Sequence, residues 1–309
     1  MNQPNLSSCA IWSPTATTIV DESWVGQYPT GIFINEQNSV YVPNSDNGSI
    51  FVWQNGTTRI IAANLINPWS LFVMTSKDIY VNSGYSNGRV DRWTLNATNG
   101  VAVMKINSSC TGLFVDIYNS LYCSAADKHR VFKVGLENNT NDSVMTVAGT
   151  SCPGPVTNML DHPHGIFVDN NLNLYVADTH NNRIQRFAFG QFNAMTVAGF
   201  GATMTFLLNK PTSVILDANH NLFIVDSYNH RIVRSIANEF KCLIGCSGGS
   251  GTSANQLHNP QTIAFDTGGS IFVTDSNNHR IQKFNLIENT CGMYIYLFRS
   301  MFINIYKHN

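Results

Sequence analysis

The histidines are the residues of this sequence whose type and spacing could carry chemistry. Two of the nine, His162 and His164, flank Pro163, and His258 lies two residues before Pro260. Neutral imidazole binds zinc and is a common general base, so these three side chains could in principle converge on one site. Only His162 and His164 are close to each other in the sequence. From this pattern we predict neither a metal site nor a bound cofactor.

Other groups capable of covalent chemistry lack the neighbours that would activate them. The sequence contains no Gly-x-Ser-x-Gly turn, and no cysteine stands beside a clear histidine and an orienting acid. Cys242 and Cys246 do not have the Cys-x-x-Cys spacing of a redox or zinc half-site. We therefore predict no catalytic residues, and we place this cysteine pair in a strand and its exit.

An internal repeat predicts the elements that position these residues. The apolar runs in each copy are short and are separated by turn residues, which is typical of strands. The copy that opens at Pro163 predicts strands at 165–169, 172–177, 183–187 and 195–199. Such a unit cannot bury both of its faces alone. We predict an all-β fold, a six-bladed β-propeller of four-stranded antiparallel blades, whose blades start near Pro29, Pro68, Cys110, Pro163, Pro211 and Pro260.

The two ends of the repeat region complement each other. The last copy lacks a convincing fourth strand, whereas residues 16–20 precede the first copy as an unassigned strand. We expect this N-terminal strand to complete the last blade. If Thr18 lies opposite Gln282, the antiparallel register also brings Cys9 opposite Cys291. This predicts a Cys9–Cys291 disulfide, with two free thiols as the alternative.

The last three copies share a signature after their second strand. In each copy an Asp ends that strand, and Asn, Arg and Ile follow a few residues later. Two of the copies have one further residue between the Asn and the Arg. The segments are Asn229-His230-Arg231-Ile232 after Asp226, Asn278-His279-Arg280-Ile281 after Asp275, and Asn182-Arg183-Ile184 after Asp178. This pattern resembles the NHL repeat, and the resemblance spans roughly Pro29 to Phe284. It is looser in the earlier copies, where Ala125 replaces the Asp and Ser49 replaces the Arg.

The resemblance implies a propeller that binds protein or RNA or, in some members, performs metal-dependent lyase or hydrolase chemistry. A lyase of this kind is expected to place zinc-binding histidines directly after the blade-opening proline, where this chain has only His164. The equivalent residues are Thr30, Trp69, Thr111, Thr212 and Gln261. A metal-dependent enzyme with an axial site near His164 is therefore the first alternative function. RNA binding is the second.

The acidic and basic residues of the signature have a structural explanation. The pairs Asp178–Arg183, Asp226–Arg231 and Asp275–Arg280 can hold the turn between the second and third strands, called here the b–c turn, through charge-assisted hydrogen bonds. Arginines that are paired in this way present little free charge to phosphates. We therefore do not expect a nucleic acid partner.

One face of the propeller collects the informative polar residues. In a four-stranded antiparallel blade, the linkers between blades and the b–c turns emerge on the same side. We predict a non-catalytic scaffold that binds a protein, peptide or glycan on this face, with ordinary solvated loops as the alternative. The residues concerned are His162, His164, His129, His180, Asn181, Tyr228, His230, Asn277 and His279.

Composition and the chain ends set the remaining expectations. The 18 Lys and Arg nearly cancel the 19 Asp and Glu, so no net field draws anionic partners. We expect an extension at 1–15, a monomeric propeller at 16–286, and an apolar tail of unknown role at 287–309. Arg299 interrupts this tail, which is too short for a membrane span. The first twenty residues do not predict a signal peptide. The compartment stays open, and an extracellular location is compatible with a chain that is part of a longer protein.

Overall fold

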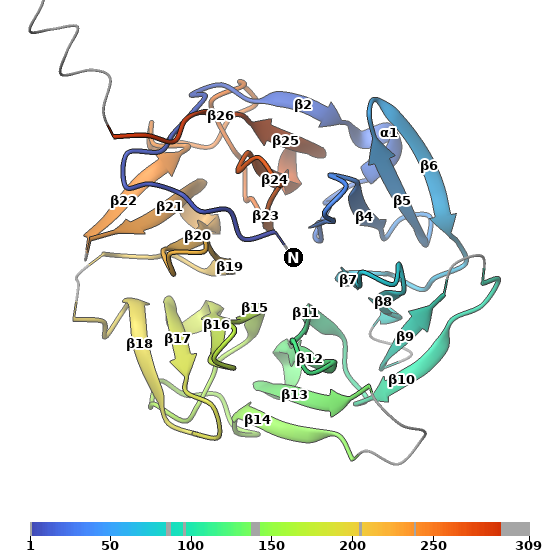
Figure 1. Cartoon of the computed structure of the whole chain (residues 1–309). Coiled ribbons are helices and arrows are strands. Elements are labelled where there is room, and N and C mark those ends of the chain that lie inside the picture. The colour runs from blue at the N-terminus through green and yellow to red at the C-terminus, as the bar shows by residue number, and fades with distance from the viewer. Residues whose placement is uncertain are drawn as a thin grey trace, which may run out of the picture.

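Six four-stranded antiparallel sheets stand as blades around one axis (Figure 1), which confirms the predicted fold. The computed structural model describes residues 2–84, 88–94, 97–136, 143–203, 206–237 and 239–291. Blades 1 to 3 contain β3 (Phe33–Ile34), β4 (Val40–Asn44), β5 (Ser49–Gln54) and β6 (Thr57–Ala62); β7 (Leu71–Val73), β8 (Ile79–Asn82), β9 (Arg89–Trp93) and β10 (Val101–Lys105); β11 (Cys110–Val115), β12 (Ser120–Ala125), β13 (Arg130–Gly135) and β14 (Met145–Gly149).

The remaining blades follow the same order from the axis outward. Blade 4 contains β15 (Pro163–Val168), β16 (Leu174–Asp178), β17 (Arg183–Phe187) and β18 (Ala194–Gly199). Blade 5 contains β19 (Pro211–Leu216), β20 (Leu222–Asp226), β21 (Arg231–Ile236) and β22 (Glu239–Ile244). Blade 6 contains β23 (Ile263–Phe265), β24 (Ile271–Asp275), β25 (Arg280–Phe284) and, as its outer strand, β2 (Thr17–Val20). One short helix, α1 (Glu22–Val25), precedes blade 1.

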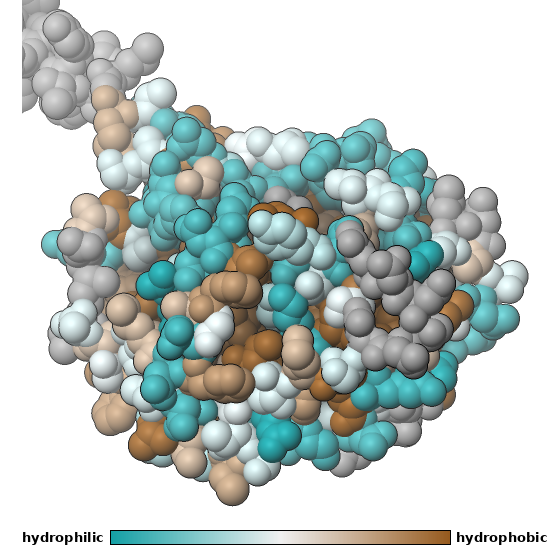
Figure 2. All heavy atoms as spheres, turned by 60° about the horizontal axis from the view of Figure 1, so that its bottom comes forward, coloured by the Kyte–Doolittle hydropathy of each residue, from teal (hydrophilic) through white to brown (hydrophobic). Residues whose placement is uncertain are grey.

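Burial explains why the inner strands have continuous apolar sequences. A second strand lies between two neighbouring blades, so both of its faces are covered, and every residue of β20 (LFIVD) is buried. The fourth strands form the rim and mix exposed, half-buried and buried residues; on β14 and β18, Met145 and Met195 face solvent. In the view of Figure 2, hydrophobic residues gather in and around a hollow, surrounded by hydrophilic ones.

A row of aromatic rings fills the core beside the axis. Phe33, Phe72, Phe114 and Phe167 occupy the same position of the first strand in blades 1 to 4, and consecutive ring centroids are 4.9, 5.3 and 5.1 Å apart. These edge and tilted contacts lie within the range that favours aromatic pairs. The row therefore packs four consecutive blades against one another next to the axis.

The last blade is closed as predicted. Strand β2 pairs with β25, and Thr18 lies opposite Gln282. A two-stranded sheet beyond the blade joins β1 (Ile11–Trp12) to β26 (Leu286–Glu288), and Cys9 forms a disulfide with Cys291. The N-terminal and C-terminal segments therefore hold each other as well as the blade.

Two further disulfides lie within blades. Cys110 on β11 is joined to Cys123 on β12, and Cys242 on β22 is joined to Cys246 just after that strand. The sequence alone left the oxidation of these four cysteines open. Cys152 is the free cysteine of the described residues and is exposed.

The N-terminal segment lies across one end of the axis, and Figure 1 shows the N-terminus at the centre of the ring. The Asn2 side chain donates to the carbonyl oxygens of Asn35 and Phe265, at 3.1 and 3.0 Å. The N–H of Ala218 donates to the carbonyl of Pro4. These contacts belong to the turns between first and second strands, on the side opposite the b–c turns. The axis is thus covered by chain on that side.

Most of the predicted tail, residues 292–309, lies outside the described residues. In the ranges that the structure describes, no helix is long and apolar enough to cross a membrane.

Candidate functional site

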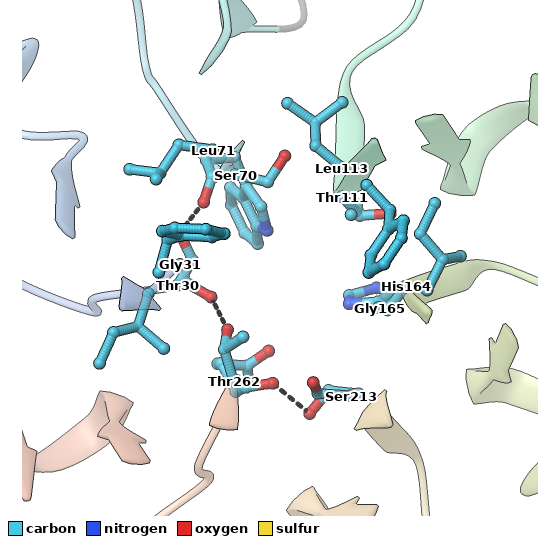
Figure 3. Close-up of a pocket in the computed structure, with 18 of the residues that line it drawn as sticks. Thr30, Gly31, Ser70, Leu71, Thr111, Leu113, His164, Gly165, Ser213 and Thr262 are labelled. Carbon is cyan, nitrogen blue, oxygen red and sulfur yellow. Dashed lines mark hydrogen bonds between the residues drawn. The ribbon is translucent and has the colours of Figure 1, made fainter. Parts of the chain in front are cut away.

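A narrow cavity of about 60 Å³ lies on the axis, between the first strands of all six blades (Figure 3). Its lining includes the residue that follows the blade-opening position in each repeat: Thr30, Trp69, Thr111, His164, Thr212 and Gln261. Because first strands begin on the side of the linkers and b–c turns, these six residues mark the end of the cavity on the predicted binding face. The same position of the six repeats thus surrounds one axial opening.

Hydroxyl groups join each blade to the next around this cavity. Each donates to a carbonyl oxygen of the following blade, and the described bonds complete a circle. They run from Thr30 to Trp69 (2.8 Å), Ser70 to Cys110 (2.9 Å), Thr111 to Pro163 (2.8 Å), Thr179 to Pro211 (2.7 Å), Thr212 to Gln261 (2.9 Å), and Thr262 to Thr30. Most of the polar lining is therefore engaged in holding the ring together.

His164 supplies the one imidazole among the described residues that line the cavity. Burial lowers the pKa of His164 to about 4, and His180 and His162 act in the same direction. The ring is therefore neutral near pH 7. An axial zinc site built from three histidines does not fit this lining, because the other blades contribute threonine, tryptophan or glutamine at the equivalent position.

The signature pairs clamp the linker that enters each of blades 4 to 6. In blade 4, Arg183 Nε donates to Asp178 Oδ2 at 2.7 Å, and the guanidinium also donates to the carbonyls of Val156 and Met159. The other Asp178 oxygen, Oδ1, accepts the N–H of Asp161 at 2.7 Å. Asp226–Arg231 and Asp275–Arg280 have the same 2.7 Å contacts. Each pair thus fixes both a turn and a linker.

The residue before each signature arginine links its blade to the next one. His129, Asn182, His230 and His279 all adopt the left-handed conformation that ends the b–c turn, with φ between 53° and 55°. Each accepts a backbone N–H from the following linker, through Nδ1 of histidine or Oδ1 of asparagine. The donors are His162 (3.3 Å), Lys210 (2.8 Å), Asn259 (3.1 Å) and Tyr28 (3.3 Å), respectively. We call these four contacts the blade staples.

The staples assign a structural contact to three histidines that the sequence placed on the binding face. An imidazole Nδ1 that accepts a hydrogen bond must be unprotonated, so His129, His230 and His279 carry their proton on Nε2 when the staple is formed. Burial lowers the pKa of His129 and of His230, and neighbouring His162 and His258 act in the same direction, respectively. Asn181 is also engaged, since its amide donates to Asp178 and to the carbonyl of Gly154.

Three predicted histidines come together around a residue that the sequence analysis did not select. Nδ1 of His162, His129 and His180 lies 2.7, 3.6 and 3.8 Å from Oδ1 of Asp161. The rings of His162 and His180 are stacked with centroids 4.0 Å apart, and the His129 ring meets His162 edge-on. We call these four residues the Asp161 cluster. Asp161 directly precedes His162 in the sequence, and this neighbouring acid is the signal that indicates the cluster.

Aromatic side chains of the same face remain exposed. Tyr228, on a one-turn 3-10 helix at Ser227–Asn229, is 49% exposed, and the Lys210 ammonium lies 4.3 Å from its ring centroid. Tyr28, in the linker to blade 1, is 55% exposed and packs edge-on against His279. Asn277, also predicted, donates its backbone N–H to the carbonyl of His258. Tyr28 was absent from the predicted face because its linker precedes the first repeat.

Comparison with known proteins agrees with this architecture. Residues 160–187 and 257–284 match the profile described as the NHL repeat, so the chain contains NHL repeats within a six-bladed propeller. No curated protein sequence matches the chain.

Solved structures share the fold at low sequence identity. One is a structural genomics protein of unknown function from Bacteroides thetaiotaomicron (TM-score 0.69, 12% identity, 91% of this chain and 74% of that one). Another is virginiamycin B lyase from Staphylococcus aureus (0.62, 12%, 87% and 98%). A third is a gluconolactonase from Xanthomonas campestris (0.64, 13%, 87% and 88%). At these identities the likeness concerns the fold alone.

Proposed function

We propose that this propeller is a non-catalytic scaffold that binds a protein, peptide or glycan on the face of the linkers and b–c turns. One observation carries the proposal: on that face, rigidly held turns present exposed aromatic side chains that make no staple or clamp of their own. Tyr28 and Tyr228 are two of them, and Trp69 stands at the axial opening. Rigid aromatic groups give large contact area at low entropic cost, which suits recognition.

The stiffness of the turns supports this proposal. The linkers that enter blades 4, 5, 6 and 1 are each held by an Asp–Arg clamp, a staple or both, so a ligand does not have to order these loops. The Tyr28 ring packs against His279 and the Tyr228 ring against Lys210, so both rings have a neighbour on the face. Little of the binding free energy would therefore be lost in ordering these loops.

The charges of the face argue against a nucleic acid ligand. Arg183, Arg231 and Arg280 each donate to a buried carboxylate and to linker carbonyls, so their donors are used internally. A phosphate backbone would have to compete with these bonds. The three disulfides favour an oxidising compartment for the scaffold.

The test removes both tyrosines from the face without disturbing the turns. Asn259 and Asn277 occupy the equivalent positions of other blades, so Tyr28→Asn and Tyr228→Asn suit the local backbone. We expect the double variant to lose at least about tenfold in affinity for ligands selected from a glycan array or a displayed peptide library.

Tyr118→Asn is the matched control. Tyr118 is exposed on the opposite side of blade 3, in a turn where blade 4 carries Asn171. Its replacement should leave binding unchanged. If Tyr118→Asn abolished binding while the double variant retained it, the proposed face would be wrong.

A further inference from the structure

The Asp161 cluster is a group of metal-binding side chains that neither the scaffold function nor the repeat signature requires. His129 comes from the b–c turn of blade 3, Asp161 and His162 come from the linker, and His180 comes from the b–c turn of blade 4. The ligand atoms of His129, Asp161 and His162 all lie within 4.8 Å of one another. These three residues are partly exposed, so an ion can reach them from solvent.

We propose that His129, Asp161 and His162 bind a divalent transition-metal ion of the zinc class at the junction of blades 3 and 4. Two imidazoles and one carboxylate form a ligand set used by zinc sites that keep a further position for an external ligand. The nitrogen ligands select zinc, copper or nickel over calcium and magnesium, which bind through oxygen.

The distances suit one small ion. Two ligand atoms bound to the same tetrahedral zinc stand about 3.3 Å apart, given bonds of about 2.0 Å. The Asp161 oxygen lies 2.7 Å from Nδ1 of His162 and 3.6 Å from Nδ1 of His129, so the observed separations lie on either side of that value. Nδ1 of His129 accepts the N–H of His162 in the staple, so coordination of the ion through that atom would replace this staple bond.

The backbone around the cluster is already fixed. The N–H of Asp161 donates to Asp178 Oδ1 at 2.7 Å, and its carbonyl accepts the N–H of His180 at 3.1 Å. The stacked His180 ring covers one side of His162.

The junction of blades 5 and 6 provides an internal comparison. There His230 corresponds to His129, and Asn259 corresponds to His162, but His258 takes the place of Asp161. The staple is preserved, whereas the carboxylate is missing. Among the residues described, the metal-ligand geometry occurs at the blade 3–4 junction only. The proposed site therefore depends on Asp161 and His162, which the blade 5–6 junction replaces by His258 and Asn259.

The test is metal titration of the tag-free full chain after removal of metal with a chelator and without reducing agent. Zinc binding is measured by competition with a chromophoric chelator, and cobalt provides the spectrum of a tetrahedral site. We expect one saturable equivalent. His129→Asn, which keeps a staple acceptor as Asn182 does, and Asp161→Asn should each weaken zinc binding at least about tenfold. His230→Asn, the same change at the other junction, should leave it unchanged.

Three outcomes would overturn the site. They are no saturable binding by the unmodified chain, equal losses in His129→Asn and His230→Asn, and thiolate charge-transfer bands that disappear in Cys152→Ser. A zinc-dependent rise in melting temperature that His129→Asn abolishes provides a second readout. Loss of the tyrosine-dependent ligand leaves the metal titration unaffected, so the two proposals fail separately.

Discussion

Blades 4 to 6 and blades 1 to 3 anchor their linkers with different residues. In the former, a buried Asp pairs with an Arg and also accepts a linker N–H. In blade 1, Asn44 accepts the N–H groups of Asp46 and Asn47 and donates to the carbonyl of Trp24. In blade 2, Asn82 accepts from Trp69 and Ser70. The signature therefore describes one way to anchor a linker, and a neutral amide is another.

Blade 3 is the intermediate case. It retains Arg130 but has Ala125 in place of the Asp, and the buried Nε of Arg130 has no hydrogen-bond partner in the described structure. The comparison teaches that the charged pair is an optional part of a blade. Removal of an anchoring residue should therefore lower the free energy of unfolding more in blades 4 to 6 than in blades 1 to 3.

The largest expected effect comes from breaking a complete clamp. Asp226→Ala leaves the Arg231 guanidinium and the Asn209 N–H without their carboxylate, and we expect a loss of about 3 to 5 kcal/mol in the free energy of unfolding. Asn44→Ala, the matched change in blade 1, removes neutral hydrogen bonds and should cost about 1 kcal/mol. Urea unfolding measures both. Equal losses would contradict a difference between the halves.

A smaller gain is expected from completing blade 3. Ala125→Asp places a carboxylate where the other blades hold theirs, opposite Arg130. We expect a stabilisation of about 1 kcal/mol, because the new charge-assisted bond exceeds the cost of burying the carboxylate only modestly. The control is a double-mutant cycle with Arg130→Ala. The interpretation fails if the gain persists without the arginine.

The smallest effect concerns the staples and depends on pH. Burial holds the pKa of His230 below its ordinary value of 6.5, so the unfolded chain takes up this proton first as the pH falls. The staple's contribution is therefore fully present above about pH 6.5 and decreases below it. His230→Asn keeps an acceptor and removes the titration, so its stability should depend less on pH between 7 and 5. Melting curves across this range test it, and identical pH profiles would contradict the staple.

The fold could be predicted because each blade repeats a local pattern. Short apolar runs, Asn-rich turns and the missing fourth strand after Phe284 together specified six blades and their closure, including Thr18 opposite Gln282. These features are local in sequence or follow from antiparallel register. The Cys9–Cys291 pairing followed from the same register.

The contacts of the face could not be predicted in the same way. The staple of His129 and the Asp161 cluster form between a turn of one blade and the linker of the next, some thirty residues apart. The alternation of apolar and polar residues does not specify which side-chain atom accepts which N–H there. The polar residues of the turns could therefore be predicted as a group, but residue type and position did not separate those that hold the ring from those that are free to bind.

The Cys9–Cys291 bond changes the covalent connectivity of the propeller. The main chain between these residues, together with the disulfide, forms a covalent macrocycle that runs once around the propeller. A single proteolytic cut within it would leave both pieces attached, and the blades could not separate as two fragments. The ring would come apart only after a second cut or after reduction, so its persistence depends on the redox state of its surroundings as well as on its folding free energy.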